Sequence, residues 1–158
     1  AHGLCNGKYR EADRRWLEVL RHLYRTLGHR SWIYREGLRQ VWVLETSYHV
    51  RPDAGLMRDR AAAYARGYFD AEGGIPKGRE SRFYVQFVQK DRSDLDTVRG
   101  ALNSLGITCG VLHVPSPRVD PDYWRFYVAS ASHRRFAAAV GSWHPRKRAL
   151  LQQRFPPR

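Results

Sequence analysis

The sequence predicts an α+β fold in which helices alternate with pairs of antiparallel strands. Three observations lead to this prediction. Apolar residues recur at helical or strand spacing in successive segments, a Pro/Gly break at residues 51–56 divides the chain, and a helix–strand–turn–strand pattern occurs twice. We therefore expect a partial, degenerate first repeat over residues 1–52 and a complete α-β-β-α-β-β-α unit over residues 53–158.

The composition indicates a polyanionic partner. The 158 residues carry 28 Lys and Arg against 15 Asp and Glu, a net charge of +13, and 24 of the basic residues are arginines. Such a charge excludes an ordinary acidic metabolic enzyme as the default and favours nucleic acid over an anionic membrane surface. With 42% apolar residues, the chain can bury a core. It has no apolar run long enough to span a membrane and no charged-then-apolar leader, so we expect a soluble, intracellular protein.

The part before the break reads as one helix and one hairpin. Residues 11–28 carry apolar side chains three and four apart and end at Gly28, which predicts an amphipathic helix. The segments RSWIYR and RQVWVLETS, separated by a turn around Gly37, predict a β-hairpin.

The part after the break begins with a helix from about Leu56 to Glu72. A second hairpin is expected over 75–90, with its turn in PKGRES, and then a helix over 93–105 with Ser93 as N-cap and Asp96 in the capping-box position. Strands are predicted in ITCGVLHV and DYWRFYVAS, joined by a Pro-rich loop, and helices near 132–140 and 145–154.

The helix ending at Glu72 has two unusual features. Ala63, Gly67 and Ala71 are four residues apart and form a stripe of small residues, which permits close approach of a second helix but also fits a helix packed on its own sheet. Glu72 places a carboxylate at the negative end of the helix dipole, so a positive group should compensate it. If two such helices pack side by side, their carboxylates form a divalent-metal site; the alternative is a solvated glutamate before a glycine cap.

The segment Ala65–Gly73, ARGYFDAEG, resembles the nine-residue motif of the LAGLIDADG homing endonucleases. Gly67, Asp70, Ala71 and Gly73 match the motif, and Glu72 replaces its second aspartate by the other carboxylate. Ala65 and Arg66 depart from the motif's Leu-Ala. The element order, the strand FVQK at 87–90 and the basic segment WHPRKR at 143–148 extend the resemblance over residues 56–154.

This resemblance implies a site-specific DNA endonuclease that uses Mg²⁺ or another divalent cation to hydrolyse phosphodiester bonds and make a double-strand break. It implies that Glu72 and the backbone carbonyl of Gly73 bind the metal, that Gln89 positions water or metal, and that Lys147 stabilises charge on the phosphate. Asp70 would be structural. Arg146 and Arg148 flank Lys147 and serve the same role equally well on sequence grounds, and Lys147 alone also fits a solvated helix start.

The resemblance further implies that a curved antiparallel sheet lies in the major groove of double-stranded DNA. Alternation along the strands then gives candidate base readers, against the alternative of a plain solvated sheet face. The residues assigned to DNA binding are Lys77, Arg79, Arg82, Tyr84, Gln86, Arg125, Tyr127, Arg146 and Arg148.

The pattern is incomplete because an active site of this family needs two acidic helices, and the chain has one clear motif. Asn6 stands where a second acid is sought in the first repeat. A homodimer through the Ala63/Gly67/Ala71 face, or a missing half, would supply the second carboxylate. With one carboxylate, the chain would nick one DNA strand or bind without cutting. A chain that only binds would be a DNA-binding regulator or an RNA-splicing maturase of the same fold.

Overall fold

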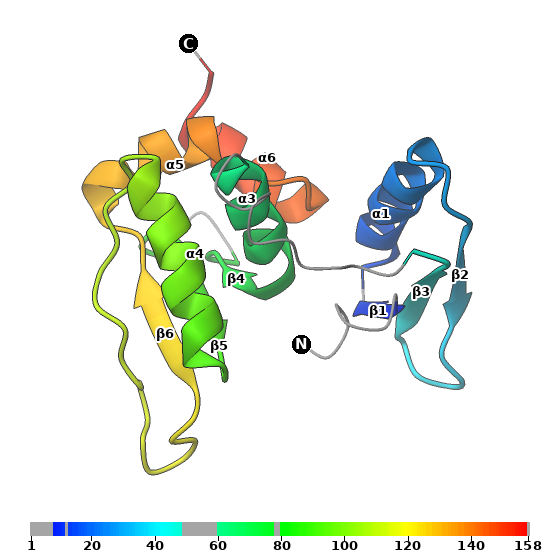
Figure 1. The fold of residues 1–158 in the computed structure, drawn as a ribbon, viewed down its shortest axis with the longest axis horizontal. Helices are drawn as coiled ribbons and strands as arrows, with labels where there is room; N and C mark the ends of the chain where they lie inside the picture. The colour runs from blue at the N-terminus through cyan, green and yellow to red at the C-terminus, as the bar shows by residue number, and fades with distance from the viewer. Residues whose placement is uncertain (1–7, 12, 49–59, 78–79, 158) are drawn as a thin grey trace. The chain divides into compact units, whose positions relative to one another are not determined.

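The computed structural model describes residues 8–11, 13–48, 60–77 and 80–157 (Figure 1). The chain divides into two compact units, 1–52 and 53–158, which are described separately. The expected linker at 51–56, the start of the helix expected from Leu56, and Asn6 lie outside the described residues. No helix in the described parts of the chain is long and apolar enough to cross a membrane.

The first unit is a three-stranded antiparallel sheet with one helix. Its elements are β1 (Lys8–Glu11), α1 (Arg14–Thr26), β2 (Ser31–Arg35) and β3 (Trp42–Thr46), with strand order β1-β3-β2. The helix ends where Gly28 adopts a φ of +82°, and Gly37 turns the hairpin with a φ of +56°. The predicted helix and hairpin are confirmed, and β1 is an additional strand.

The second unit contains a three-stranded antiparallel sheet of order β4-β5-β6. Its elements are α3 (Ala61–Glu72), β4 (Gly73–Gly74), β5 (Gln86–Gln89), α4 (Arg92–Ser104), β6 (Trp124–Tyr127), a 3₁₀ turn η1 (Ser130–Ser132), α5 (His133–Ala139) and α6 (Pro145–Arg154). The predicted helices are confirmed. The second hairpin was expected over 75–90, but its first strand is Gly73–Gly74, before that range, and its return strand is limited to Gln86–Gln89.

The strand expected in ITCGVLHV is reduced to two isolated bridges, Cys109 with Val128 and His113 with Arg125. The bridged positions are four residues apart on one segment and three apart on the other. One extra residue therefore interrupts the ladder, as in a β-bulge.

Four fully buried phenylalanines form the centre of the second unit's core: Phe69, Phe87, Phe126 and Phe136. Phe87 stacks on Phe126 across the sheet with ring centroids 5.0 Å apart, and Phe69 meets Phe136 edge-on at 5.0 Å. Figure 1 shows α3 and α4 packed side by side in this unit. This packing fixes the position of the C-terminal end of α3 relative to β5.

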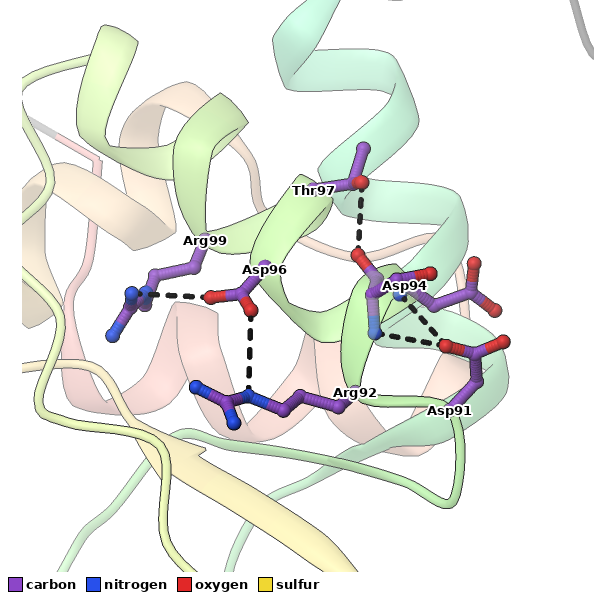
Figure 2. A network of polar contacts seen from close by, with 7 residues as sticks. Asp91, Arg92, Asp94, Asp96, Thr97 and Arg99 are labelled. Atoms are coloured by element: carbon purple, nitrogen blue, oxygen red, sulfur yellow. Dashed lines mark hydrogen bonds and ion pairs between the residues drawn. The ribbon is translucent and has the colours of Figure 1, made fainter.

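The N-cap of α4 is Asp91, so the predicted Ser93 cap and Asp96 capping box are wrong. The Asp91 carboxylate accepts hydrogen bonds from the backbone N–H groups of Ser93 and Asp94, at 2.8 and 3.4 Å (Figure 2). The N-cap therefore lies two residues earlier than predicted, and the helix begins at Arg92. Asp96 instead pairs with Arg92 and Arg99 on the exposed face (Figure 2).

The two units share several structural details. Asp13 caps α1 as Asp91 caps α4. An arginine in the first helical turn lies over the ring of the first residue of the last strand in both units: Arg14 over Trp42 at 4.8 Å, and Arg92 over Trp124 at 4.9 Å. In each sheet that tryptophan pairs with the end of the strand before the helix, Glu11 in β1 and Gln89 in β5.

These details give the internal repeat its register. Strand β1 corresponds to β5, α1 to α4 and β3 to β6, so Glu11 takes the position of Gln89. The acid-bearing helix α3 has no counterpart among the described residues of the first unit.

Candidate active site at the end of helix α3

Helix α3 ends at Glu72 because the chain becomes extended at the next residue, Gly73. Gly73 has φ −76° and ψ 145°, and its N–H donates to the carbonyl of Phe69. A Cβ added to Gly73 would lie 2.1 Å from the Cδ2 atom of Phe69 and 2.5 Å from its carbonyl oxygen. Only glycine fits between the helix end and the core here.

Asp70 fastens this helix end to the segment that leads into α6. The side chain is 4% exposed and its carboxylate accepts hydrogen bonds from the Ser142 hydroxyl and from the backbone N–H groups of Trp143 (3.0 Å) and His144 (3.4 Å). A buried carboxylate requires such donors to offset its lost hydration. The structural role expected of Asp70 is consistent with this geometry.

Lys147 on α6 lies against the same helix end. It is 5% exposed, and its Nζ atom donates to the carbonyls of Phe69 at 2.6 Å and Asp70 at 3.0 Å. The ammonium also lies 4.9 Å from the centroid of the Phe69 ring. The positive group that the dipole argument required is therefore Lys147. The alternative of a solvated lysine is wrong, and the exposed Arg146 and Arg148 do not take this place.

Glu72 is half-buried beside this charge. Burial raises the pKa of its carboxyl above the ordinary glutamate value, and the Lys147 ammonium opposes part of that shift. The alternative of a fully solvated glutamate does not fit this environment.

Gln89 lies on the core face of the sheet, as the alternation predicted. It is paired with Trp124, next to the buried pair Phe87 and Phe126. Its Oε1 atom accepts a hydrogen bond from the Lys90 backbone N–H at 2.8 Å. The side chain also lies near enough to the hydroxyl of Tyr68 on α3 to lower the pKa of that tyrosine slightly.

The oxygen donors available to a divalent cation are the Glu72 carboxylate and the Gly73 carbonyl. Oxygen ligands of this kind suit Mg²⁺. Within the described parts of the chain, no group of three or more His, Cys, Asp or Glu side chains gathers to hold a metal ion. Glu72 and Gly73 therefore offer oxygen groups of the kind that a divalent cation binds, without a cluster of three acidic, histidine or cysteine ligands around them in the described part of the chain.

The stripe of small residues on α3 faces away from the unit's core. Ala63, Gly67 and Ala71 are all exposed, and a Cβ built on Gly67 would meet nothing within 4 Å. The alternative that this stripe packs on the unit's own sheet is wrong, because the buried face of α3 is made by Ala65, Tyr68 and Phe69.

The opposite face of the sheet carries four of the predicted DNA readers. Register pairs Gln86 with Tyr127 and Val88 with Arg125, which places these side chains on the face away from Phe87. The ring of Tyr84 meets that of Tyr127 edge-on at 6.1 Å. Tyr84, Gln86, Arg125 and Tyr127 are therefore neighbours.

Aromatic rings hold Arg125 in place on this face. Its guanidinium lies 5.8 Å from the centroids of both Tyr123 and Tyr127, and Nη1 donates to the Tyr127 hydroxyl at 3.0 Å. His113 stacks on Tyr127 at 6.1 Å. A guanidinium held in this way is suited to directional recognition because it loses little conformational freedom on binding.

The remaining basic residues are more dispersed. Lys77 and Arg82 are exposed in the segment between β4 and β5, and Arg79 lies outside the described residues. Arg146 and Arg148 are exposed on α6 rather than on the sheet, and Arg146 Nη1 donates to the Pro76 carbonyl at 3.3 Å.

Two functional features were missed by sequence reasoning. Arg66, a departure from the motif, donates to the Val140 carbonyl and lies 5.1 Å from the Trp143 ring, so it clamps α3 to the segment between α5 and α6. Tyr68 received no role from the sequence, yet its hydroxyl is buried near the Gln89 side chain and within electrostatic reach of Glu72. Its identity as tyrosine was the available signal, since a phenolic hydroxyl in a core position needs a reason.

Comparison with known proteins places this arrangement in a family. The LAGLIDADG-like domain family matches residues 59–141. The homing endonuclease I-DmoI in complex with DNA and Mn is 16% identical over 85% of this chain and 79% of that chain, with a TM-score of 0.59. Mesophilic variants of I-DmoI give 16% identity over 92% and 82%, with a TM-score of 0.63.

The N-terminal LAGLIDADG domain of DUF199/WhiA is 17% identical over 87% of this chain and 77% of that chain, with a TM-score of 0.59. At these identities the solved structures share the fold. No curated protein matches the sequence. The resemblance found in the motif segment and the predicted fold are both confirmed.

The bonds made by Asp70 predict a large stability effect. We expect Asp70→Ala to lower the free energy of unfolding by about 3 kcal/mol, because it leaves the donors of Ser142, Trp143 and His144 without their acceptor. Asp96→Ala is the matched control: its pairs are exposed, and it should change stability by less than about 0.5 kcal/mol. Urea unfolding measures both, and equal effects of the two variants would contradict the role assigned to Asp70.

The environment of Glu72 predicts a pH-dependent gain in stability. The pKa of Glu72 is higher in the folded than in the unfolded protein, so folding favours the protonated carboxyl. The protonated carboxyl therefore adds to the free energy of unfolding. This contribution is complete at pH values below the unfolded-state pKa and is lost as the pH rises through the folded-state pKa. Glu72→Gln mimics the protonated form, so its melting temperature should exceed that of wild type at pH 7. The difference should shrink towards about pH 4, near the ordinary glutamate pKa. Thermal unfolding at several pH values tests this, and a variant less stable than wild type at pH 7 would refute it.

Proposed function

Because this chain belongs to the LAGLIDADG-like domain family, we propose that it is a site-specific DNA endonuclease that makes a metal-dependent double-strand break. The observation that carries the proposal is the end of α3, where half-buried Glu72 lies beside the buried ammonium of Lys147. The C-terminal end of a helix is stabilised by a cation or a capping group, and a half-buried carboxylate there opposes stability. A carboxylate kept in such a position supports a functional role for Glu72.

The residues at this helix end have distinct roles in the proposed reaction. Glu72 and the Gly73 carbonyl bind a divalent cation, Mg²⁺ by its preference for oxygen ligands. When bound, this ion activates water and neutralises charge on the phosphate. Gln89 orients water at the site. Lys147, fixed by the Phe69 and Asp70 carbonyls, stabilises the negative charge that develops on the scissile phosphate.

The second carboxylate is proposed to come from a second copy of the chain. Ala63, Gly67 and Ala71 leave an exposed, small-residue face on α3 that permits close helix approach, and such packing would pair the two Glu72 residues at their helix ends. A separate half of a longer endonuclease would serve the same purpose. In either case the first unit is a degenerate repeat that adds sheet surface.

Double-stranded DNA is proposed to bind on the sheet face of Tyr84, Gln86, Arg125 and Tyr127, with Lys77 and Arg82 in the segment between β4 and β5. Arg79, outside the described residues, remains a candidate from the sequence alone. The net charge of +13 supports phosphate contacts and strong salt dependence of binding. Arginine and glutamine side chains make bidentate contacts with base edges in the major groove.

A non-cleaving DNA-binding regulator or RNA-splicing maturase is the second candidate. One observation favours it: the Asp70 carboxylate at the helix end is engaged by residues 142–144, and among the described residues no cluster of three metal-ligating side chains joins Glu72. The structural similarity to the LAGLIDADG domain of DUF199/WhiA shows that the fold also occurs outside I-DmoI.

Cleavage of a randomised-site plasmid library in Mg²⁺ separates the two candidates. We expect discrete cuts with wild type and a loss on the order of a thousandfold or more in Glu72→Ala, because the metal's stabilisation of the transition state is removed. Glu80→Ala, which removes an exposed carboxylate of the same unit, should cut like wild type. Specific DNA binding without cuts in any divalent metal would overturn the nuclease proposal and leave a regulator or maturase.

Selection of bound duplexes tests the sheet face independently of cleavage. Arg125→Ala should relax sequence preference at one base pair, costing about 1–3 kcal/mol there, because a positioned guanidinium contacts a guanine edge. Arg82→Ala, an exposed arginine of the neighbouring loop, should weaken binding to all sequences alike and reduce the salt slope. A uniform loss of affinity in Arg125→Ala would show that this residue contacts only the backbone.

A further inference from the structure

The hydroxyl of Tyr68 is buried in the core of the second unit. Tyr68 is 8% exposed, and its ring packs against Phe87 at 6.2 Å and Tyr64 at 6.3 Å. Among the residues that the structure describes, no group makes a hydrogen bond of good geometry with its oxygen. Phenylalanine would fill the same space, so the hydroxyl adds nothing to the packing.

A buried hydroxyl that lacks a partner opposes folding, because it gives up hydration and gains no hydrogen bond in return. Buried polar groups of this kind are rare in native proteins and usually reflect an ordered water, an ion or a functional role. The Tyr68 hydroxyl therefore calls for an explanation beyond stability.

The surroundings of the hydroxyl supply one. Tyr68 and Glu72 are four residues apart and lie on one face of α3. Burial raises the pKa of Tyr68, the charges of Asp94 and Glu72 raise it further, and the Gln89 side chain opposes the shift. The hydroxyl thus remains protonated at neutral pH, and it lies within electrostatic reach of both Glu72 and Gln89.

Gln89 has a donor group to offer this hydroxyl. Its Oε1 accepts from the Lys90 N–H, so the NH₂ end of the amide is the part that can donate to the Tyr68 oxygen. Tyr68 then has its own O–H to give to a further acceptor at the junction of α3 and β5.

We propose that Tyr68 is a positioning residue of the cleavage site, whose hydroxyl orients Gln89 and holds an ordered water beside Glu72. This inference rests on the proposed nuclease function and adds a residue to it. Tyr68 transfers no proton. Its hydroxyl fixes the water and the amide that face the ligand carboxylate, as outer-shell groups do around metal sites.

Tyr68→Phe tests the proposal because it removes only the hydroxyl. Tyr64→Phe is the matched control, since Tyr64 is half-buried one turn earlier on the same helix. Three quantities are measured on the full chain: the melting temperature, the affinity for Mn²⁺ alone and with duplex DNA by electron paramagnetic resonance, and the single-turnover cleavage rate. Tyr68→Phe should remain folded, with a single cooperative thermal transition, bind Mn²⁺ about tenfold more weakly and cut about tenfold more slowly. Tyr64→Phe should match wild type in Mn²⁺ affinity and cleavage.

Each other outcome has a definite meaning. Unchanged Mn²⁺ affinity and cleavage in Tyr68→Phe overturn the role of Tyr68, and so does an equal loss of Mn²⁺ affinity in Tyr64→Phe. If wild type binds Mn²⁺ but leaves DNA intact, the nuclease proposal alone fails, and the Mn²⁺ affinity of Tyr68→Phe still decides the role of its hydroxyl. A wild type that binds no Mn²⁺ overturns both.

Discussion

The buried C-terminal end of α3 is the constraint on which the second unit depends. The last carbonyls of a helix have no partner within the helix, and together they carry partial negative charge. Here Lys147 satisfies the carbonyls of Phe69 and Asp70, while Asp70 in turn holds the segment that leads into α6. Lys147 of α6 therefore satisfies carbonyls at the end of α3, and Asp70 of α3 satisfies donors in the segment that precedes α6.

This reciprocal arrangement also sets the chemistry of the site. Gly73 turns the chain away immediately after Glu72, since no side chain fits against Phe69, and the carboxylate stays near the buried ammonium. Burial disfavours the charge of Glu72 and Lys147 favours it, so a further cation at this carboxyl would stabilise its ionised form. The half-buried charge costs stability, as polar groups at functional sites commonly do, and this is consistent with the proposed role.

Local signals were sufficient to predict the helices and the acidic helix end, but not every strand. Spacing identified α1, α3 and α4, Gly28 and Gly37 marked the end of α1 and the turn of the first hairpin, and the motif located Glu72 and Gly73. Alternation placed Gln89 on the core face because a strand has a fixed period. Other features depend on tertiary contacts that the sequence could not decide. Lys147 enters the core rather than Arg146 or Arg148, and Asp91 rather than Ser93 caps α4. The burial of the Tyr68 hydroxyl, with no hydrogen-bond partner of good geometry among the described residues, is a third such feature.

The exposed stripe on α3 leads to a similar conclusion about what lies outside the unit. Glycine within a helix costs about 1 kcal/mol relative to alanine. Gly67 adopts an ordinary helical conformation, and a Cβ at this position would meet no atom within 4 Å. Nothing in the unit itself therefore requires a glycine there. A requirement for glycine would arise if another helix approached α3 at backbone distance between Ala63 and Ala71, which is the contact that would bring a second carboxylate to Glu72.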